Sequence, residues 1–273
     1  MSRVFHREEL EGLATFWRVA RRDGVTLGFT SHDRDLWLDG LLHRAAPGML
    51  PSAVRRTADL APDSVEVEGT LAHDAISADD LAEGRFDGAR IRLGVLDWES
   101  GESAVLYRGE IGAIADEGGH FAAELLSAKA QLAIDPVPRT SPTCRAEFCG
   151  PGCTLSAARF THDLRIASVD FAANAVTLSG GPSATNFRDG RLRWLEGSLI
   201  GLSTPVTDVS GGALVLEDEL PPDAAPGWLM RLREGCDHTL ATCSARFANA
   251  ANFQGEPFLP GNDILARYPA RAS

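Results

Sequence analysis

Short runs of β-forming residues, separated by tight-turn signals, fill most of this chain and limit what it can fold into. The pairs Asp23-Gly24 and Asp39-Gly40 each stand between such runs, and Asp-Gly between β-formers is a strong hairpin signal. Residues 89–98 alternate in polarity, as a half-buried strand requires. The apolar positions there are Ile91, Leu93 and Val95, with Arg90, Arg92 and Gly94 between them. The chain is therefore predicted to be mainly β.

Two β series on either side of a proline-rich segment predict two β domains. The first series covers residues 14–41, 64–71, 89–98 and 103–113, and the second covers 159–169, 176–178, 187–202 and 214–216. Residues 135–142 contain three prolines, which interrupt strand ladders. A length of 273 residues is enough for two domains. We expect an N-terminal β domain at 1–135, a linker at 136–143, a β domain at 144–245 and a C-terminal covering segment at 246–273.

Helical signals are few and short. Ser77 is a suitable N-cap for an acidic first turn at Asp79 and Asp80, and Gly84 can end that helix after about two turns. Residues 8–16 could begin as a helix or continue as an extended arm. We therefore expect few short helices beside the strands.

Charge and hydropathy narrow the function classes. The net charge of −12 argues against sequence-independent nucleic-acid binding, which depends on cations that neutralise phosphates. The first 13 residues lack the apolar core of a signal peptide, and no run of about 18 apolar residues suggests a membrane span. We therefore expect synthesis in the cytoplasm and no membrane span.

Enzyme signatures are missing from the sequence. It contains no Gly-x-Ser-x-Gly elbow, no phosphate-binding loop and no His-Glu-x-x-His motif. The most catalytic-looking string is His32-Asp33-Arg34-Asp35, but strand alternation would separate its side chains, and its place after a strand favours a polar turn. The adjacent pairs His73-Asp74, His162-Asp163 and Asp237-His238 are predicted to lie on the surface. A non-enzymatic protein is expected.

Five cysteines form two groups separated by some 80 residues of expected sheet. Groups so far apart in the sequence can meet only in the folded chain. The first group is Cys144, Cys149 and Cys153, and the second is Cys236 and Cys243. Two separated loops held by a β framework are one way to supply a four-thiolate metal site. Gly150, Pro151 and Gly152 allow the bend that would turn a thiolate inward.

The cysteine spacing alone leaves the metal open between zinc and iron–sulfur. Zinc sites usually contain a Cys-x-x-Cys knuckle, which is missing here, although His238 could supply a nitrogen ligand. The simplest alternative is five unrelated thiols, some of them buried as small apolar side chains. Disulfides are disfavoured because the expected compartment is reducing.

Several motifs in one order resemble a family of phage and gene-transfer-agent tail hub proteins. The motifs are FWRVARRDGV at 16–25, LGFTSHDRDL at 27–36, SPTCRAE at 141–147, FQGEP at 253–257 and PGND at 260–263. The cysteine at position 153 and the pair Cys236 and Cys243 follow the same pattern. The C-terminal part is similar to the iron–sulfur minor tail protein of lambda-type phages. The resemblance spans nearly the whole chain.

The resemblance implies a hub or baseplate component of a phage-like tail tip, of siphophage or gene-transfer-agent type. It implies that Cys144, Cys153, Cys236 and Cys243 bind a [4Fe-4S] cluster, which would close the second β domain as a structural clip. The implied partners are a homo-oligomeric ring, most often a trimer, the distal tail protein, and central fibre or receptor-binding proteins. Cys149 has no counterpart in the family pattern and is expected to be a free thiol. The alternative is a soluble zinc or redox-active iron–sulfur enzyme.

Overall fold

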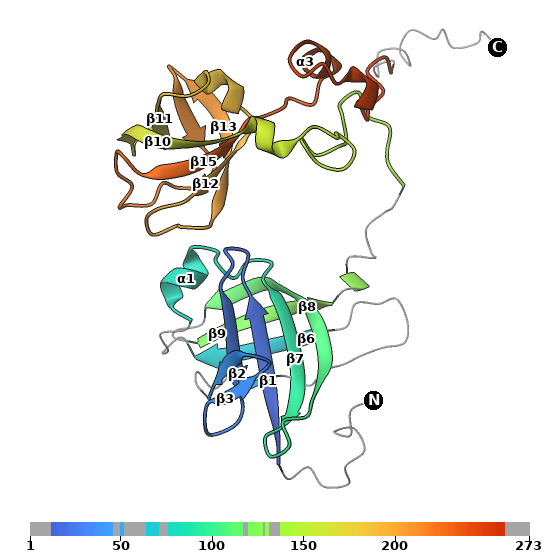
Figure 1. Cartoon of the computed structure of the whole chain (residues 1–273), viewed down its shortest axis with the longest axis vertical. Coiled ribbons are helices and arrows are strands. Elements are labelled where there is room, and N and C mark those ends of the chain that lie inside the picture. Colours follow the sequence, from blue (N-terminus) through green and yellow to red (C-terminus); the bar gives the residue numbers. More distant parts are fainter. Residues whose placement is uncertain are drawn as a thin grey trace, which may run out of the picture. The chain divides into compact units, whose positions relative to one another are not determined.

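β-Strands build both halves of the chain, which divides between Pro136 and Val137. The computed structural model describes residues 12–45, 50–51, 64–70, 76–116, 120–127, 129–130 and 137–259. The two units, Met1–Pro136 and Val137–Ser273, are shown in Figure 1. The division falls at the proline-rich segment, and the mainly β fold class is confirmed.

One nine-stranded sheet forms the N-terminal unit, in the order β3-β4-β2-β1-β7-β8-β9-β6-β5. Its strands are β1 Leu13–Ala20, β2 Thr26–Thr30, β3 Leu36–Leu38, β4 Leu41–Arg44, β5 Leu50–Pro51, β6 Ser64–Thr70, β7 Arg90–Asp97, β8 Ser103–Asp116 and β9 His120–Ser127. All neighbouring pairs are antiparallel except β2 and β4, which are parallel. The expected strands at 64–71, 89–98 and 103–113 are therefore present, and residues 13–16, left open, are part of β1 rather than a helix.

Apolar side chains from five strands of this sheet meet in one core. Trp17 of β1, Phe29 of β2, Leu93 of β7, Ile111 of β8 and Leu125 of β9 belong to the same buried cluster. The sheet must therefore curl around that cluster, as the strongly curved strands in Figure 1 show. Burial on this scale is the dominant favourable contribution to the fold.

Local signals predicted the turns and the helix of this unit correctly. Gly24 has φ +102° in the β1–β2 hairpin, and Asp39 and Gly40 have φ 50° and 75° between β3 and β4. Positive φ at both central residues is typical of the turn that Asp-Gly favours. Helix α1, Ala78–Ala82, begins as expected after Ser77, whose hydroxyl accepts a hydrogen bond from the Asp80 N–H at 3.0 Å.

The expected alternation along β7 holds only for its first half. Ile91 and Leu93 are buried, but Gly94 and Leu96 are buried as well, and Val95 is only half-buried. A register shift against β8 lies between Leu93 and Gly94. Beyond it the outer face is also covered, because Leu96 packs with Phe16 and Leu38 in a second small cluster. Both faces of the sheet are thus apolar at this end.

A closed six-stranded barrel forms the C-terminal unit, in the order β10-β11-β14-β13-β12-β15. Its strands are β10 Thr161–Asp170, β11 Ala175–Ser179, β12 Arg191–Trp194, β13 Ser203–Ser210, β14 Ala213–Leu216 and β15 Leu229–Arg233. Short helices are η2 Ala157–Phe160, η3 Ala184–Phe187, α3 Leu240–Ala245 and η4 Ala250–Asn252. The interior is fully buried, with Val176, Leu192, Leu214, Met230 and Leu232 at 0% exposure.

The β segment expected at residues 187–202 is shorter in the structure. Only Arg191–Trp194 is strand, because Phe187 belongs to η3 and the loop after Trp194 turns at Gly197 and Gly201, with φ 88° and 87°. Strands β13 and β15 were not predicted. Turns with positive φ at Asn174 and at Gly211-Gly212 connect β10 to β11 and β13 to β14.

Backbone pairing closes the second unit. β10 and β15, its first and last strands, pair antiparallel from Thr161 opposite Arg233 to Arg165 opposite Leu229. The sequence-based expectation that a four-cysteine metal site closes this domain is therefore corrected, because hydrogen bonds between these two strands already complete the barrel. The cysteine segments lie before and after the paired strands.

Candidate metal centre

Strand pairing explains why the two cysteine groups come together. Thr161 at the start of β10 lies opposite Arg233 at the end of β15. The chain that enters β10 and the chain that leaves β15 must therefore run beside each other. Cys153 comes eight positions before Thr161, and Cys236 comes three after Arg233, so the barrel places both groups at one edge.

Four of the five cysteines line one small cavity of about 20 Å³. They are Cys144, Cys153, Cys236 and Cys243, the four singled out from the sequence. Cys149 is not among the residues that line it. The rest of the wall is formed by Ala146, Phe148, Leu155, His238, Thr239, Phe247, Asn249 and Asn252.

A tight bend shapes the first cysteine segment. The Gly150 N–H donates to the Glu147 carbonyl at 2.9 Å, and the Cys153 N–H donates to the Gly150 carbonyl at 3.1 Å. Cys149 has φ 61°, a left-handed conformation that is uncommon outside glycine. The turn expected at Gly150 is therefore present, and it directs Cys153 to the cavity while Cys149 lies outside it.

A capped helix shapes the second segment. The Thr239 hydroxyl accepts from the Thr242 N–H at 3.2 Å at the start of α3. Asp237 accepts hydrogen bonds from the backbone and side chain of Thr239 at 2.9 Å and from the Thr242 hydroxyl at 2.7 Å. This helix carries Cys243 into the cavity. The helix was not expected, although threonine before Leu240 is an N-cap signal that could have found it.

N–H donors lie against three of the sulfurs. The Gln254 N–H donates to Cys144 Sγ at 3.3 Å, and Asn249 Nδ2 lies 3.7 Å from Cys153 Sγ while donating to the Cys153 carbonyl at 2.7 Å. The backbone N–H of His238 donates to the Cys236 thiol. Such donors stabilise thiolates and tune the metals that thiolates bind. Asn249 and Gln254 were not found from the sequence, since nothing local marks them.

Three aromatic rings pack beside the cavity. Phe148 and Phe247 have centroids 4.8 Å apart, and Phe160 lies 5.4 Å from each of them. Phe148 and Phe247 are buried together with Cys153. The rings join the first cysteine segment, η2 and the end of α3 into one small core that limits water access to the sulfurs.

The described part of the C-terminal segment, residues 246–259, packs on the cysteine loops. Glu256 forms two hydrogen bonds with Arg145, at 2.7 and 3.0 Å, and accepts from the Ser141 N–H at 2.9 Å. These contacts hold the pKa of Glu256 below its usual value. Ser141, predicted as linker, therefore belongs to the second unit. The remainder of the predicted covering segment lies outside the described residues.

Burial raises the pKa of three of the five thiols. It raises the pKa of Cys149 to about 11, with a further contribution from the neighbouring Cys153. Burial also raises the pKa of Cys236, which the His238 N–H lowers in part, and the pKa of Cys243, which lies near Cys144 and Cys153. A metal that binds these groups must displace protons, so its affinity rises with pH.

The arrangement of the described side chains does not form a single-ion site. Among them, no group of three or more His, Cys, Asp or Glu side chains has the geometry to hold one metal ion. His238, the alternative nitrogen ligand, has Nδ1 at 3.0 Å from the Cys144 carbonyl. A carbonyl oxygen only accepts, so Nδ1 carries the proton and Nε2 is the ring atom that could ligate.

The other sequence candidates have structural partners. His32 Nδ1 accepts from the Arg34 N–H at 3.0 Å, and Asp35 accepts from the Ala45 N–H at 2.9 Å, so this string forms the expected polar turn. His162 bonds to Glu234 at 2.9 Å and Asp163 to Arg231 at 2.7 and 2.8 Å. The pair His73-Asp74 lies outside the described residues.

Comparisons with known proteins decide the family. The model of the baseplate hub protein N-terminal attachment domain matches residues 6–156, more than half of the chain. The chain belongs to the phage baseplate hub protein family. A model of a phage conserved hypothetical protein family matches residues 185–263. The hub attachment match contains the first cysteine group, and the second match contains Cys236 and Cys243.

One solved structure resembles nearly the whole hub-family chain. It is a chain of the virion of a native gene transfer agent particle, with a TM-score of 0.82 and 30% sequence identity. The match covers 98% of this chain and 95% of that one. No curated protein matches the sequence. Within the described residues, every helix is too short or too polar to cross a membrane.

Proposed function

We propose that this chain is a structural, non-enzymatic hub of the tail tip of a phage-like particle, made in the cytoplasm and assembled into the tail. The observation that carries the proposal is the similarity to a gene transfer agent virion chain over 98% of the length. A fold match that covers both units supports a common architecture, and assembly follows from the family to which the chain belongs. Gene transfer agent and siphophage tails fit this role equally.

We further propose that Cys144, Cys153, Cys236 and Cys243 hold a [4Fe-4S] cluster. Support comes from the cavity, which these four line and Cys149 does not. The aromatic wall and the N–H donors to sulfur are the surroundings that tune cysteine-bound clusters. When bound, the group supplies four metal–thiolate bonds that cross-link the loops. Asn249, Gln254 and His238 then orient and stabilise the thiolates.

Zinc is the alternative metal, which the cavity volume favours although no group of the described side chains has the geometry to hold one ion. The space between the four side chains is about 20 Å³, roughly the room needed for one water. A cluster of four irons and four sulfides requires the two cysteine loops to separate further than one tetrahedral zinc ion does. The donor set alone serves either metal.

Anaerobic purification followed by iron, zinc and acid-labile sulfide analysis tests the centre. The proposal expects four irons and four sulfides per chain. Serine at position 144, 153, 236 or 243 should abolish the iron content, whereas Cys149→Ser, the matched control, should retain it. Zinc without sulfide in the wild type would refute the cluster and keep the four-thiolate site. Full iron in a ligand variant would refute the ligand set.

A ring of hub copies, most often a trimer in this class, is the proposed assembly, between the distal tail protein and the central fibre or receptor-binding proteins. Cyclic symmetry would make each contact join two different surfaces of neighbouring copies. Native mass spectrometry of the purified full chain tests this, with a stable closed oligomer expected. A monomer at all concentrations, together with absence of the chain from purified particles, would refute the hub role.

A further inference from the structure

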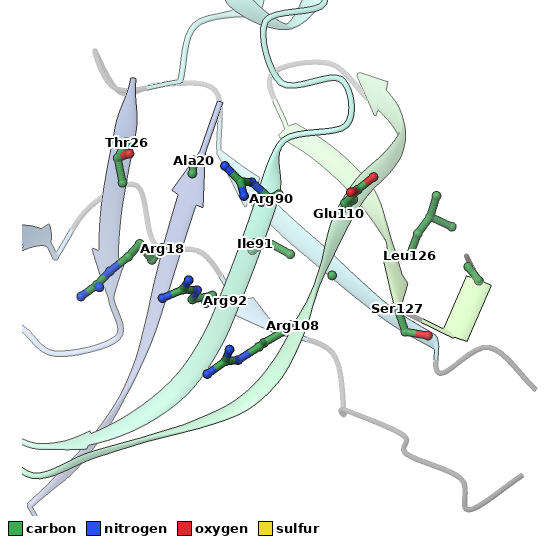
Figure 2. A pocket seen from close by; sticks show the side chains of 12 residues that line it. Arg18, Ala20, Thr26, Arg90, Ile91, Arg92, Arg108, Glu110, Leu126 and Ser127 are labelled. Carbon is green, nitrogen blue, oxygen red and sulfur yellow. The ribbon is translucent and has the colours of Figure 1, made fainter. Parts of the chain in front are cut away.

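Three arginines stand side by side across the outer face of the N-terminal sheet. Arg18 of β1 lies opposite Arg92 of β7, and Arg92 lies opposite Arg108 of β8. Figure 2 shows their guanidinium groups following one another across the three strands. Their neighbours in sequence, Trp17 and Leu93, are buried in the core on the other face. The arginine row therefore belongs to the solvent side.

The row lines a hollow of about 560 Å³. Arg90 stands two positions before Arg92 on the same face and lines it too, with Glu110 as the acidic residue of the wall. A second hollow of about 410 Å³ shares Ala20, Arg90 and Glu110 with the first and adds Arg22. The basic surface thus continues along the sheet face.

Like charges directly opposite each other on a sheet destabilise it. Arg90, Arg92 and Arg108 are exposed, and within the described ranges none of them forms an ion pair. Arg18 donates to the Leu38 carbonyl at 3.1 Å and reaches Asp39 at 3.4 Å, but its Nε is buried without a partner. The chain as a whole carries 26 Lys and Arg against 38 Asp and Glu. A row of arginines in which Arg92 and Arg108 have no ion pair among the described residues, in so acidic a protein, indicates an anionic partner.

We infer that this arginine face docks an acidic, extended segment of a neighbouring tail protein. The guanidinium fork matches carboxylates bidentately. Neighbouring strands are about 4.8 Å apart and alternate residues of an extended segment are about 6.6 Å apart, so two or three carboxylates on one face of the segment can meet the row. The inference rests on the proposed hub role, since it names the surface through which the N-terminal unit attaches.

Charge and lining favour protein over nucleic acid as the occupant. The net charge of −12 repels a long, densely charged nucleic acid more strongly than a short segment with two or three carboxylates, and Glu110 stands within the hollow. Leu126, which is 39% exposed, and Ala20 provide apolar surface beside the arginines. Arginine mixed with apolar surface is typical of protein interfaces.

Binding of a labelled ten-residue polyglutamate peptide to the full chain tests the chemistry, with polyglutamine and a DNA duplex as comparison probes. Arg92→Glu and Arg108→Glu should each weaken polyglutamate binding at least tenfold. Arg193→Glu should leave it unchanged, because this exposed arginine of β12 carries the same charge outside the hollow. Arg92→Gln guards against misfolding and should weaken binding less. Equal binding by wild type and Arg92→Glu, no binding by the wild type, or tighter binding of DNA would each overturn the inference.

Incorporation into purified particles separates this inference from the hub role. The docking surface and the hub role are both supported if particles contain the wild-type and Arg193→Glu chains but lack the Arg92→Glu and Arg108→Glu chains. Wild type and all three variants present at equal levels would overturn the docking surface and leave the hub role standing. A wild-type chain absent from particles overturns the hub role itself. Loss of the chain's own oligomer in Arg92→Glu, measured by light scattering, would assign the face to a second copy and overturn the choice of partner.

Discussion

Glu234 is the side chain whose replacement should most loosen the cysteine loops without touching a sulfur. It stands just after β15 with a side chain that is only 10% exposed. One carboxylate oxygen bonds to His162 Nε2 at 2.9 Å and the other to Arg246 at 2.5 Å. Arg246 also donates to the carbonyls of Gly235 and Asn186, at 3.0 and 2.9 Å. This network connects the end of α3 to the barrel.

Glu234→Gln keeps the shape of the side chain but replaces one acceptor oxygen by an NH₂ group. That group cannot accept the hydrogen bond that His162 or Arg246 donates to the carboxylate. Breaking a buried ion pair by removing one partner costs about 3–5 kcal/mol. His162 and Arg246 retain 26% and 29% exposure, so water compensates part of the loss. We expect a loss of about 2.5 kcal/mol in the free energy of opening, which is roughly a 70-fold faster hydrogen exchange.

Hydrogen exchange followed by mass spectrometry on peptides from residues 229–246 measures that opening. Asp208→Asn is the matched control, because it removes the same charge from the same unit. Its ion pair with Arg188, at 2.9 Å, joins side chains that are 50% and 61% exposed. Such pairs contribute less than about 1 kcal/mol, or roughly fivefold in exchange. If Glu234→Gln also stays within fivefold of wild type, the network does not anchor α3 and the reasoning fails.

Three further results are expected. Burial lowers the pKa of His43, so below the usual value of 6.5 the folded protein binds fewer protons than the unfolded chain. Urea unfolding of the N-terminal unit should therefore show a free energy of unfolding that falls below that pH by up to about 1.4 kcal/mol per pH unit. His43→Phe should flatten this slope. Gly235→Ala should lower the melting temperature, since its Cβ would lie 1.7 Å from the Arg188 carbonyl oxygen; unchanged melting would contradict the clash. Phe247→Ala should speed iron loss to a chelator, and an unchanged rate would separate the aromatic wall from the centre.

Local chemistry explains what the sequence could predict of the fold. Hairpins at Asp23-Gly24 and Asp39-Gly40, and the cap at Ser77, depend on a few adjacent residues, and the structure has all three. Strand β15 and the pairing that closes the barrel depend on partners far along the chain, such as His162 opposite Leu232. No local signal specifies such a register, so closure of the barrel by strand pairing could not be predicted from the sequence.

The candidate centre divides in the same way. Clustering indicated only the two cysteine groups, and the family resemblance selected the four cysteines that share the cavity and set Cys149 apart from them. The donors to sulfur lie far along the chain from the cysteines they contact: Asn249 is 96 residues from Cys153, and Gln254 is 110 residues from Cys144. Their role follows from the docking of residues 246–259, which only tertiary structure reveals. The arginine row likewise requires the registers of β1, β7 and β8.

Closure by strands changes what a bound cluster can contribute. A link between the cysteine groups would restrict a loop of about 90 residues in an unfolded chain, which is the case of largest entropic stabilisation. In the folded unit, however, Thr161 and Arg233 are already paired, so the barrel ends meet without metal. Outside this pairing, α3 and the segment that follows it are held by a few backbone bonds to residues 141–145, by the aromatic rings and by Glu234. Thiolate bonds to a bound metal would therefore act mainly on this small lobe, and removal of such a metal should open the lobe before the barrel.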